Sequence, residues 1–153
     1  MKNLQLLLVD DEERFLSTTK SLLEKRGVST QTASGGREAL RILENKRIDV
    51  VMLDVKMPDM DGIEALRLIK QRFPLIEVIM LTGHASVDSA VDGMRLGAFD
   101  YLMKPCDITE MLNKVQQAFI KKQVTEEKIQ KLQVERIISH PMAVFDKNGK
   151  ARE

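Results

Sequence analysis

The chain has 153 residues and a formal net charge of +1 at pH 7, from 24 basic and 23 acidic side chains. This length suits one domain with a hydrophobic core, and the balanced charge gives no argument for binding nucleic acid or a membrane. The single cysteine, Cys106, excludes an intramolecular disulfide and is typical of a reducing compartment. The longest apolar runs have four residues, too few for a transmembrane helix or a signal peptide. These features predict a cytoplasmic protein.

Short apolar runs alternate with amphipathic segments along the first 120 residues. The runs predict strands over Leu4–Val9, Ile48–Leu53, Ile76–Leu81 and Ala98–Met103. A weaker alternation of small and polar residues predicts an edge strand over Val28–Thr32. The predicted strands therefore number five.

The segments between and after the strands have the apolar spacing of helices. The fourth helix contains Gly93, which costs roughly 1 kcal/mol relative to alanine, so we expect it to be the least rigid. Asp107, with Glu110 three residues later, predicts a capping box at the start of the fifth helix. The predicted helices run from about residue 12 to Gly27, from Ser34, from Gly62 to Arg72, from about Ser86, and from Asp107.

Five strands alternating with five helices predict an α/β fold, in which a parallel sheet is covered by helices on both faces. Among doubly wound folds, the flavodoxin-like order 2-1-3-4-5 puts the polar second strand at an edge. It also makes the first and third strands neighbours, so that Asp10, Asp11 and Asp54 meet at the carboxyl edge of the sheet. Ligands of open α/β sheets bind at this edge.

Three carboxylates at one edge repel each other, since two unit charges about 4 Å apart cost roughly 4 kcal/mol at an effective dielectric near 20. An oxygen-only set of ligands is what Mg²⁺ prefers, and Lys104 ends the fifth strand at the same edge. We expect Asp54 to be an exposed carboxylate there, with the Thr82 hydroxyl nearby. A metal, a lysine and a free carboxylate favour phosphoryl transfer to Asp54.

Four segments together resemble the receiver domain of bacterial two-component response regulators, over about residues 3 to 121. No single segment is specific, but the combination is. The four are Leu8-Val9-Asp10-Asp11-Glu12, the stretch from Asp54 to Gly62 (Asp-Val-Lys-Met-Pro-Asp-Met-Asp-Gly), Leu81-Thr82-Gly83-His84, and the stretch from Gly97 to Pro105 (Gly-Ala-Phe-Asp-Tyr-Leu-Met-Lys-Pro).

The resemblance implies a role for each acid at the carboxyl edge. Asp54 is expected to be the phosphoacceptor, which takes the phosphoryl group from a phosphohistidine of a sensor histidine kinase. Asp11 is expected to ligate Mg²⁺ directly, and Asp10 partly through water. Asp54 itself and the backbone carbonyl of Lys56 complete the expected metal ligands.

The resemblance also implies how the state of Asp54 is reported. Thr82 would hydrogen-bond the phosphoryl group, and Lys104 would pair with one of its oxygens, with a cis Lys104-Pro105 bond. Tyr101 would rotate inward when Thr82 moves. The output would be a change in the surface made by the fourth helix, fifth strand and fifth helix. A homodimer that forms on phosphorylation is among the expected partners, together with a downstream protein or domain.

Two other functions stay open. A phosphatase or phosphotransferase with an aspartyl nucleophile, similar to the haloacid dehalogenase group, would need a second Asp two residues after the nucleophile, where this chain has Lys56. A module that binds its partner without phosphorylation would not need the complete set of site residues. His84 is expected to be a loop residue, and the resemblance implies that Lys56 and His84 tune dephosphorylation. Cys106 is expected to be unreactive.

The domain prediction is a receiver over residues 1–121, a helical extension or linker over 122–139, and a C-terminal tail over 140–153. The apolar residues of the extension do not keep a strict heptad, so a coiled coil is only weakly predicted. His140-Pro141 is expected to end the helix. The tail is expected to be either disordered or the start of a further element.

Overall fold

The structure is a computed structural model that describes residues 3–83 and 86–139. It contains one sheet of five parallel strands in the order β2-β1-β3-β4-β5, as predicted. The polar strand β2 lies at an edge, and the apolar strands β1, β3 and β4 lie inside the sheet. The strands are β1 (Gln5–Val9), β2 (Ser29–Ala33), β3 (Val50–Leu53), β4 (Glu77–Thr82) and β5 (Asp100–Met103).

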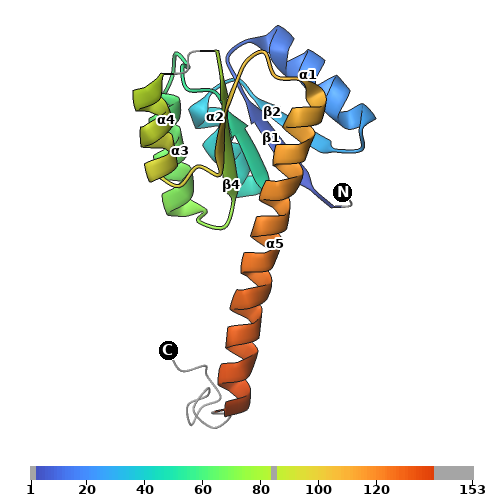
Figure 1. The fold of residues 1–153 in the computed structure, drawn as a ribbon, viewed down its shortest axis with the longest axis vertical. Helices are drawn as coiled ribbons and strands as arrows, with labels where there is room; N and C mark the ends of the chain where they lie inside the picture. The colour runs from blue at the N-terminus through green and yellow to red at the C-terminus, as the bar shows by residue number, and fades with distance from the viewer. Residues whose placement is uncertain (1–2, 84–85, 140–153) are drawn as a thin grey trace. The chain divides into compact units, whose positions relative to one another are not determined.

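Helices cover both faces of the sheet (Figure 1). One hydrophobic cluster joins the sheet to α1 (Glu13–Lys25) and to the first three turns of α5 (Ile108–Ser139). The other cluster joins the opposite face to α2 (Gly36–Asn45) and α3 (Gly62–Arg72), with α4 (Val87–Arg95) on the same side. The strands inside the sheet are apolar on both faces because each face is buried under helices.

The register of the sheet aligns the ends of its inner strands. Val9 is paired with Leu53, and Leu53 with Met80. The next residue of β1 is Asp10 and the next residue of β3 is Asp54, whose backbone N–H donates to the Val9 carbonyl at 3.1 Å. The two carboxylates therefore leave adjacent strands at the same level.

The boundaries differ from the predictions by one or two residues. Strands β3 and β5 begin two residues later than predicted, and β4 continues to Thr82. Asp107 accepts a hydrogen bond from the Glu110 backbone N–H at 2.8 Å, which is one half of the predicted capping box. A complete capping box that the sequence analysis missed is formed by Ser86 and Ser89 at the start of α4.

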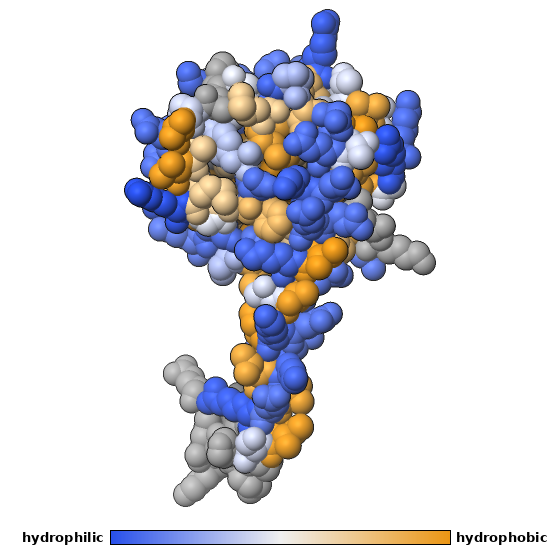
Figure 2. Space-filling model, in the orientation of Figure 1, coloured by the Kyte–Doolittle hydropathy of each residue, from blue (hydrophilic) through white to orange (hydrophobic). Residues whose placement is uncertain are grey.

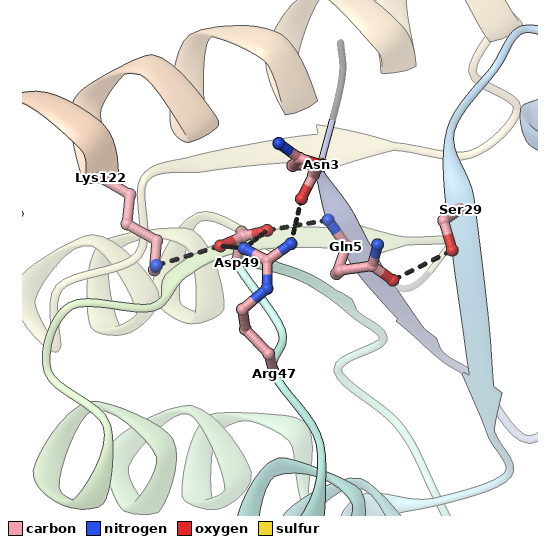
Figure 3. Close-up of polar contacts among 6 residues, drawn as sticks. All are labelled: Asn3, Gln5, Ser29, Arg47, Asp49 and Lys122. Atoms are coloured by element: carbon pink, nitrogen blue, oxygen red, sulfur yellow. Dashed lines mark hydrogen bonds and ion pairs between the residues drawn. The ribbon is translucent and has the colours of Figure 1, made fainter.

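Two buried carboxylates lie at the amino edge of the sheet. The Asp49 side chain is 1% exposed. It accepts hydrogen bonds from the Gln5 backbone N–H at 2.8 Å, from the Arg47 guanidinium at 3.0 Å and from the Lys122 ammonium at 3.0 Å (Figure 3). Because these donors come from three parts of the chain, Asp49 ties β1 and α5 to the residues before β3.

Glu77, the second of these carboxylates, begins β4 and is also buried. Its carboxylate lies 3.2 Å from the Lys121 ammonium and 3.7 Å from the Lys70 ammonium. Burial lowers the pKa of Lys70, and the Glu77 charge opposes that change. Neighbouring lysines of α5 are thus paired with both buried acids.

The chain divides into two compact units, residues 1–122 and 123–153. The described part of the second unit is helical to Ser139. The predicted domain boundaries at residues 121 and 139 stay predictions. The predictions for His84, for His140-Pro141 and for the tail concern residues that the structure does not describe. Over residues 3–83 and 86–139, no helix combines the length and the apolar character that crossing a bilayer requires.

The amino-edge carboxylate Asp49 should be a large contributor to stability. We expect Asp49→Ala to lower the free energy of unfolding by about 3–5 kcal/mol, because it leaves Lys122 and a backbone N–H without their buried partner. Urea unfolding measures the change. The control is Glu44→Ala, which removes an ion pair with Arg72 whose side chains are 56% and 51% exposed and should cost about 0–1 kcal/mol. Equal losses for the two variants would contradict the assignment.

Candidate functional site

Three carboxylates meet at the carboxyl edge of the sheet. One oxygen from each of Asp10, Asp11 and Asp54 lies within 4.8 Å of the other two. Asp10 and Asp54 are 1% and 3% exposed, whereas Asp11 is exposed. The Asp10 carboxylate also accepts a hydrogen bond from the Glu12 backbone N–H at 2.9 Å. The structure therefore brings together the acids that the sequence predicted to meet.

Lys104 supplies positive charge to this cluster. Its ammonium group lies 2.5 Å from Asp10 Oδ2, 3.9 Å from Asp54 Oδ2 and 3.7 Å from Glu12 Oε1. It also lies 4.1 Å from the centre of the Phe15 ring, a cation–π distance. The Lys104-Pro105 bond is cis, as expected. One lysine cannot neutralise the acids that surround it, so the site keeps an excess of negative charge.

Asp54 is buried, and the prediction of an exposed carboxylate is wrong. Asp54 is 3% exposed, and Val55 and Met57, which follow it, are buried in the hydrophobic cluster that also contains α2 and α3. Asp54 Oδ1 has no hydrogen-bond partner within residues 3–83 and 86–139. A buried, unpaired carboxylate oxygen is costly, and such atoms need a further ligand or a functional explanation.

The first residue of α3 packs closely against Asp54 and Val55, and this contact holds the loop after β3 in place. The Gly62 backbone N–H donates to the Val55 carbonyl at 2.6 Å. A Cβ atom on residue 62 would lie 2.0 Å from the Asp54 carbonyl oxygen, a distance that atoms cannot adopt. Asp61 caps the helix by accepting from the Ile63 N–H at 2.8 Å. Only glycine at position 62 permits this packing.

A second contact holds the middle of the same loop. The Asp59 carboxylate accepts from the Gly36 and Arg37 backbone N–H groups at 3.3 and 3.1 Å. These are the first N–H groups of α2, where a negative charge is favourable. A Cβ atom on Gly35 would lie 2.5 Å from Asp59 Oδ1. The loop after β3 is therefore fixed to two helices.

An open hollow of 440 Å³ lies beside the acid cluster. Asp11 belongs both to the cluster and to the wall of the hollow, and the side chain of Lys56 is exposed there. The hollow gives a route from solvent to the acids. The lining residues are Asp11, Val55, Lys56, Met57, Pro58 and Asp61.

The two predicted switch residues take different positions. Thr82 is the last residue of β4, is fully buried, and is paired in register with Met103. Its carbonyl accepts from the Lys104 N–H at 2.9 Å, which places Thr82 beside the site. The Tyr101 hydroxyl instead bonds to Ser89 Oγ of α4 at 2.7 Å. Ser89 is also a capping residue of α4, and the sequence signal for this role is weak, because the usual capping box has Glu or Gln at this position.

Comparisons with known proteins agree with this geometry. The family model for the response regulator receiver domain matches residues 6–116. The regulatory protein AtoC of Escherichia coli (strain K12) is 42% identical over 117 residues, which are 74% of this chain and 25% of AtoC. The chain therefore spans about a quarter of the length of the curated relatives it matches.

Solved structures are similar over the same region. A CheY-like response regulator receiver domain protein from Methanospirillum hungatei JF-1 has a TM-score of 0.77 and 32% identity, and the match covers 80% of this chain and 98% of that one. The beryllofluoride-activated NtrC4 receiver domain dimer has a TM-score of 0.73 and 38% identity, with coverage of 77% and 98%.

A five-stranded doubly wound sheet with clustered acids and a lysine at its carboxyl edge defines an α/β signalling domain. The chain belongs to the response regulator receiver domain family. Its function is that of a receiver in two-component signalling. The flavodoxin-like fold and the family predicted from the sequence are both confirmed.

The close approach at Gly62 can be tested by adding one methyl group. We expect Gly62→Ala to lower the free energy of unfolding by about 2 kcal/mol or more, because the backbone at Asp54 must move. The matched control is Gly83→Ala, since a Cβ atom there meets no atom within 4 Å. Urea unfolding compares the two. A Gly62→Ala variant as stable as Gly83→Ala would show that the loop adjusts freely.

The thiol of Cys106 should react slowly. Burial raises its pKa from 9.0 to about 11, and the charge of Glu110 adds to the effect. Only the thiolate is nucleophilic, so at pH 8 its fraction should be about 100-fold below that of an ordinary thiol. We expect the alkylation rate to rise about tenfold per pH unit through pH 9.5 without levelling off.

The control for this rate is a Cys106→Ser chain that carries Gln71→Cys on the exposed surface of α3. Its rate should begin to level off near pH 9. Iodoacetamide labelling followed by intact mass gives both profiles. A Cys106 profile that levels off with the control would mean that the raised pKa is wrong.

Proposed function

We propose that Asp54 accepts a phosphoryl group from a phosphohistidine of a sensor histidine kinase. The observation that carries the proposal is the buried Asp54 carboxylate: its Oδ1 accepts no hydrogen bond from residues 3–83 and 86–139, and its Oδ2 lies 3.9 Å from the Lys104 ammonium. In the step itself, an Asp54 oxygen bonds to phosphorus while the phosphorus–nitrogen bond to the histidine breaks. The freed imidazole then takes up a proton from solvent. Aspartate is an established phosphoryl acceptor.

The acid cluster fits a divalent cation. Its donors are all oxygens. One of them is buried and accepts no hydrogen bond from the part of the chain that the structure describes, and Lys104 offsets only part of their charge. These properties suit Mg²⁺. Asp10, Asp11, Asp54 and the Lys56 carbonyl would hold it. When bound, the ion would neutralise charge on the phosphoryl oxygens.

The residues of the chain itself orient and stabilise the incoming group. The Lys104 ammonium, which already contacts Asp10 and Asp54, would pair with a phosphoryl oxygen. The Thr82 hydroxyl, at the end of the neighbouring strand, would donate to another. The burial of the Asp54 carboxylate, which is 3% exposed, lowers the local dielectric and strengthens these interactions.

The output would be a change in the surface of α4, β5 and α5. In this proposal, Tyr101 leaves Ser89 and turns inward once Thr82 binds the phosphoryl group. The surface already exposes several apolar side chains: Val87 (81% exposed), Val91 (42%) and Met94 (48%) on α4, and Met103 (61%) on β5. Exposed apolar patches are typical of protein contacts. The contact would be with a downstream protein or a second phosphorylated chain.

The family is one of signalling domains. The only catalysis that we propose for this chain is its own phosphorylation and dephosphorylation. The phosphatase alternative is not favoured, because Lys56 stands where that group needs its second Asp. The cytoplasmic location and the absence of direct nucleic acid binding are further parts of the proposal that stay predictions.

Incubation with Mg²⁺ and acetyl phosphate tests the acceptor. Wild-type protein should gain the mass of one phosphoryl group, and the gain should vanish with excess chelator. Asp54→Ala should show no gain, and Lys104→Ala a much smaller one. Intact-mass spectrometry measures all four. The control is Asp92→Asn on the exposed surface of α4, which should be phosphorylated as wild type is. An equal gain for Asp54→Ala would assign the acceptor elsewhere.

A further inference from the structure

A regular stripe of exposed side chains runs along α5. Its members recur with the 4-3-4-3-4 spacing of a heptad seam and are Ile120, Val124, Glu127, Lys131, Val134 and Ile138. All six are exposed, and the four apolar ones are 51%, 42%, 53% and 72% exposed in chain order. Figure 2 shows orange apolar residues among blue polar ones along this helix.

The stripe is the best seam that this helix offers. Four of its six positions are apolar, whereas every other heptad register over residues 118–139 contains at most three apolar residues. The two polar members, Glu127 and Lys131, hide the repeat, because they occupy consecutive seam positions in the middle. If only the apolar residues are counted, the heptad repeat therefore stops in the middle of the stripe.

The six residues complement themselves when a second copy runs in the opposite direction. In an antiparallel pair related by a two-fold axis, residue i meets residue j and j meets i. Aligning Glu127 with Lys131 of the second copy places Val124 opposite Val134 and Ile120 opposite Ile138. Every apolar residue then meets an apolar residue, and the two-fold axis repeats the contact between Glu127 and Lys131, so that each charge meets one opposite charge.

A parallel pair would lack this match. It would place Glu127 opposite Glu127 and Lys131 opposite Lys131, and two like-charged layers in a seam are unfavourable. The surrounding charges also argue against a lipid surface, since residues 120–138 carry five basic and three acidic side chains, with Glu127 inside the stripe. Membrane-surface helices instead separate a basic polar face from an apolar face without acids.

We infer that residues 120–138 form an antiparallel two-stranded coiled coil with a second copy of this chain. The paired segment is short, about 28 Å at 1.5 Å per residue, so the association should be weak and should depend on concentration. The inference involves no residue of the phosphoryl site, so it can fail while the proposed function holds, and the converse is also true.

Sedimentation equilibrium of the full chain tests the pairing. The wild-type mass should rise with concentration toward that of a dimer, and Val124→Asp should stay monomeric. The control is Ile129→Asp, which places the same charge on the opposite side of the helix, where Ile129 is 40% exposed. It should associate as wild type does. If both variants lost association, or if neither did, the proposed seam would be wrong.

Disulfide trapping tests the direction. In a Cys106→Ser background, chains with Val124→Cys and chains with Val134→Cys are mixed, one of them labelled with nitrogen-15, and mildly oxidised. Antiparallel pairing should give mainly the mixed disulfide, because Val124 faces Val134 of the other copy. A majority of 124–124 and 134–134 disulfides would show a parallel pair and overturn the inference. Cross-linking no greater than that of Leu132→Cys, off the seam, would overturn it as well.

The central charges provide a separate test. Glu127→Lys should reduce the dimer fraction, because the introduced ammonium group of one copy then faces the Lys131 ammonium of the other. Adding Lys131→Glu should restore it, since the exchange rebuilds both opposite-charge contacts. Equal dimer fractions in wild type and in both variants would contradict the pairing of Glu127 with Lys131.

Discussion

The receiver site depends on one lysine that holds together acids from different strands. Asp10 follows β1, Asp54 follows β3 and Lys104 follows β5, so the three meet only because the sheet has the order 2-1-3-4-5. The buried acids would repel each other in a dry environment without a positive charge near them. Lys104 reduces that repulsion but leaves negative charge in excess. The remaining charge is what makes the edge suitable for a cation and a phosphoryl group.

The amino edge of the sheet also carries buried acids, but there each acid lies beside more than one cation. Asp49 and Glu77 are as buried as Asp54, yet each has two or more cationic partners. At that edge the charges of the acids are compensated by these cations, although Glu77 Oε1, like Asp54 Oδ1, accepts no hydrogen bond from the described residues. At the carboxyl edge the acids outnumber the lysine. The contrast separates acids that stabilise the fold from acids that are available for chemistry.

Much of the fold and site could be predicted from local patterns, and the failures have physical causes. The strand order followed from the polar residues of β2, and the site from acids and a lysine placed directly after buried strands. The burial of Asp54 could not be predicted, because it depends on a loop that is closed by the contacts of Gly62 and Asp59 with other parts of the chain. Asp49 and Glu77 were missed because each lies inside a predicted strand, and their cationic partners on α3 and α5 are far away in the sequence. The exposed stripe on α5 was not recognised from the sequence, because Glu127 and Lys131 interrupt its apolar positions.

The hydrogen bond between Tyr101 and Ser89 has a consequence for how a signal would leave the domain. Ser89 also completes the capping box with Ser86, so a single hydroxyl serves both the ring and the first turn of α4. If the ring turned away, as the proposed switch requires, that hydroxyl would lose a partner, and the helix start would lose part of its polar support. The first turn of α4 would then fray more easily, and Val87, the most exposed apolar residue of that turn, would move with it. Rotation of the Tyr101 ring would in this way make the first turn of α4 less ordered.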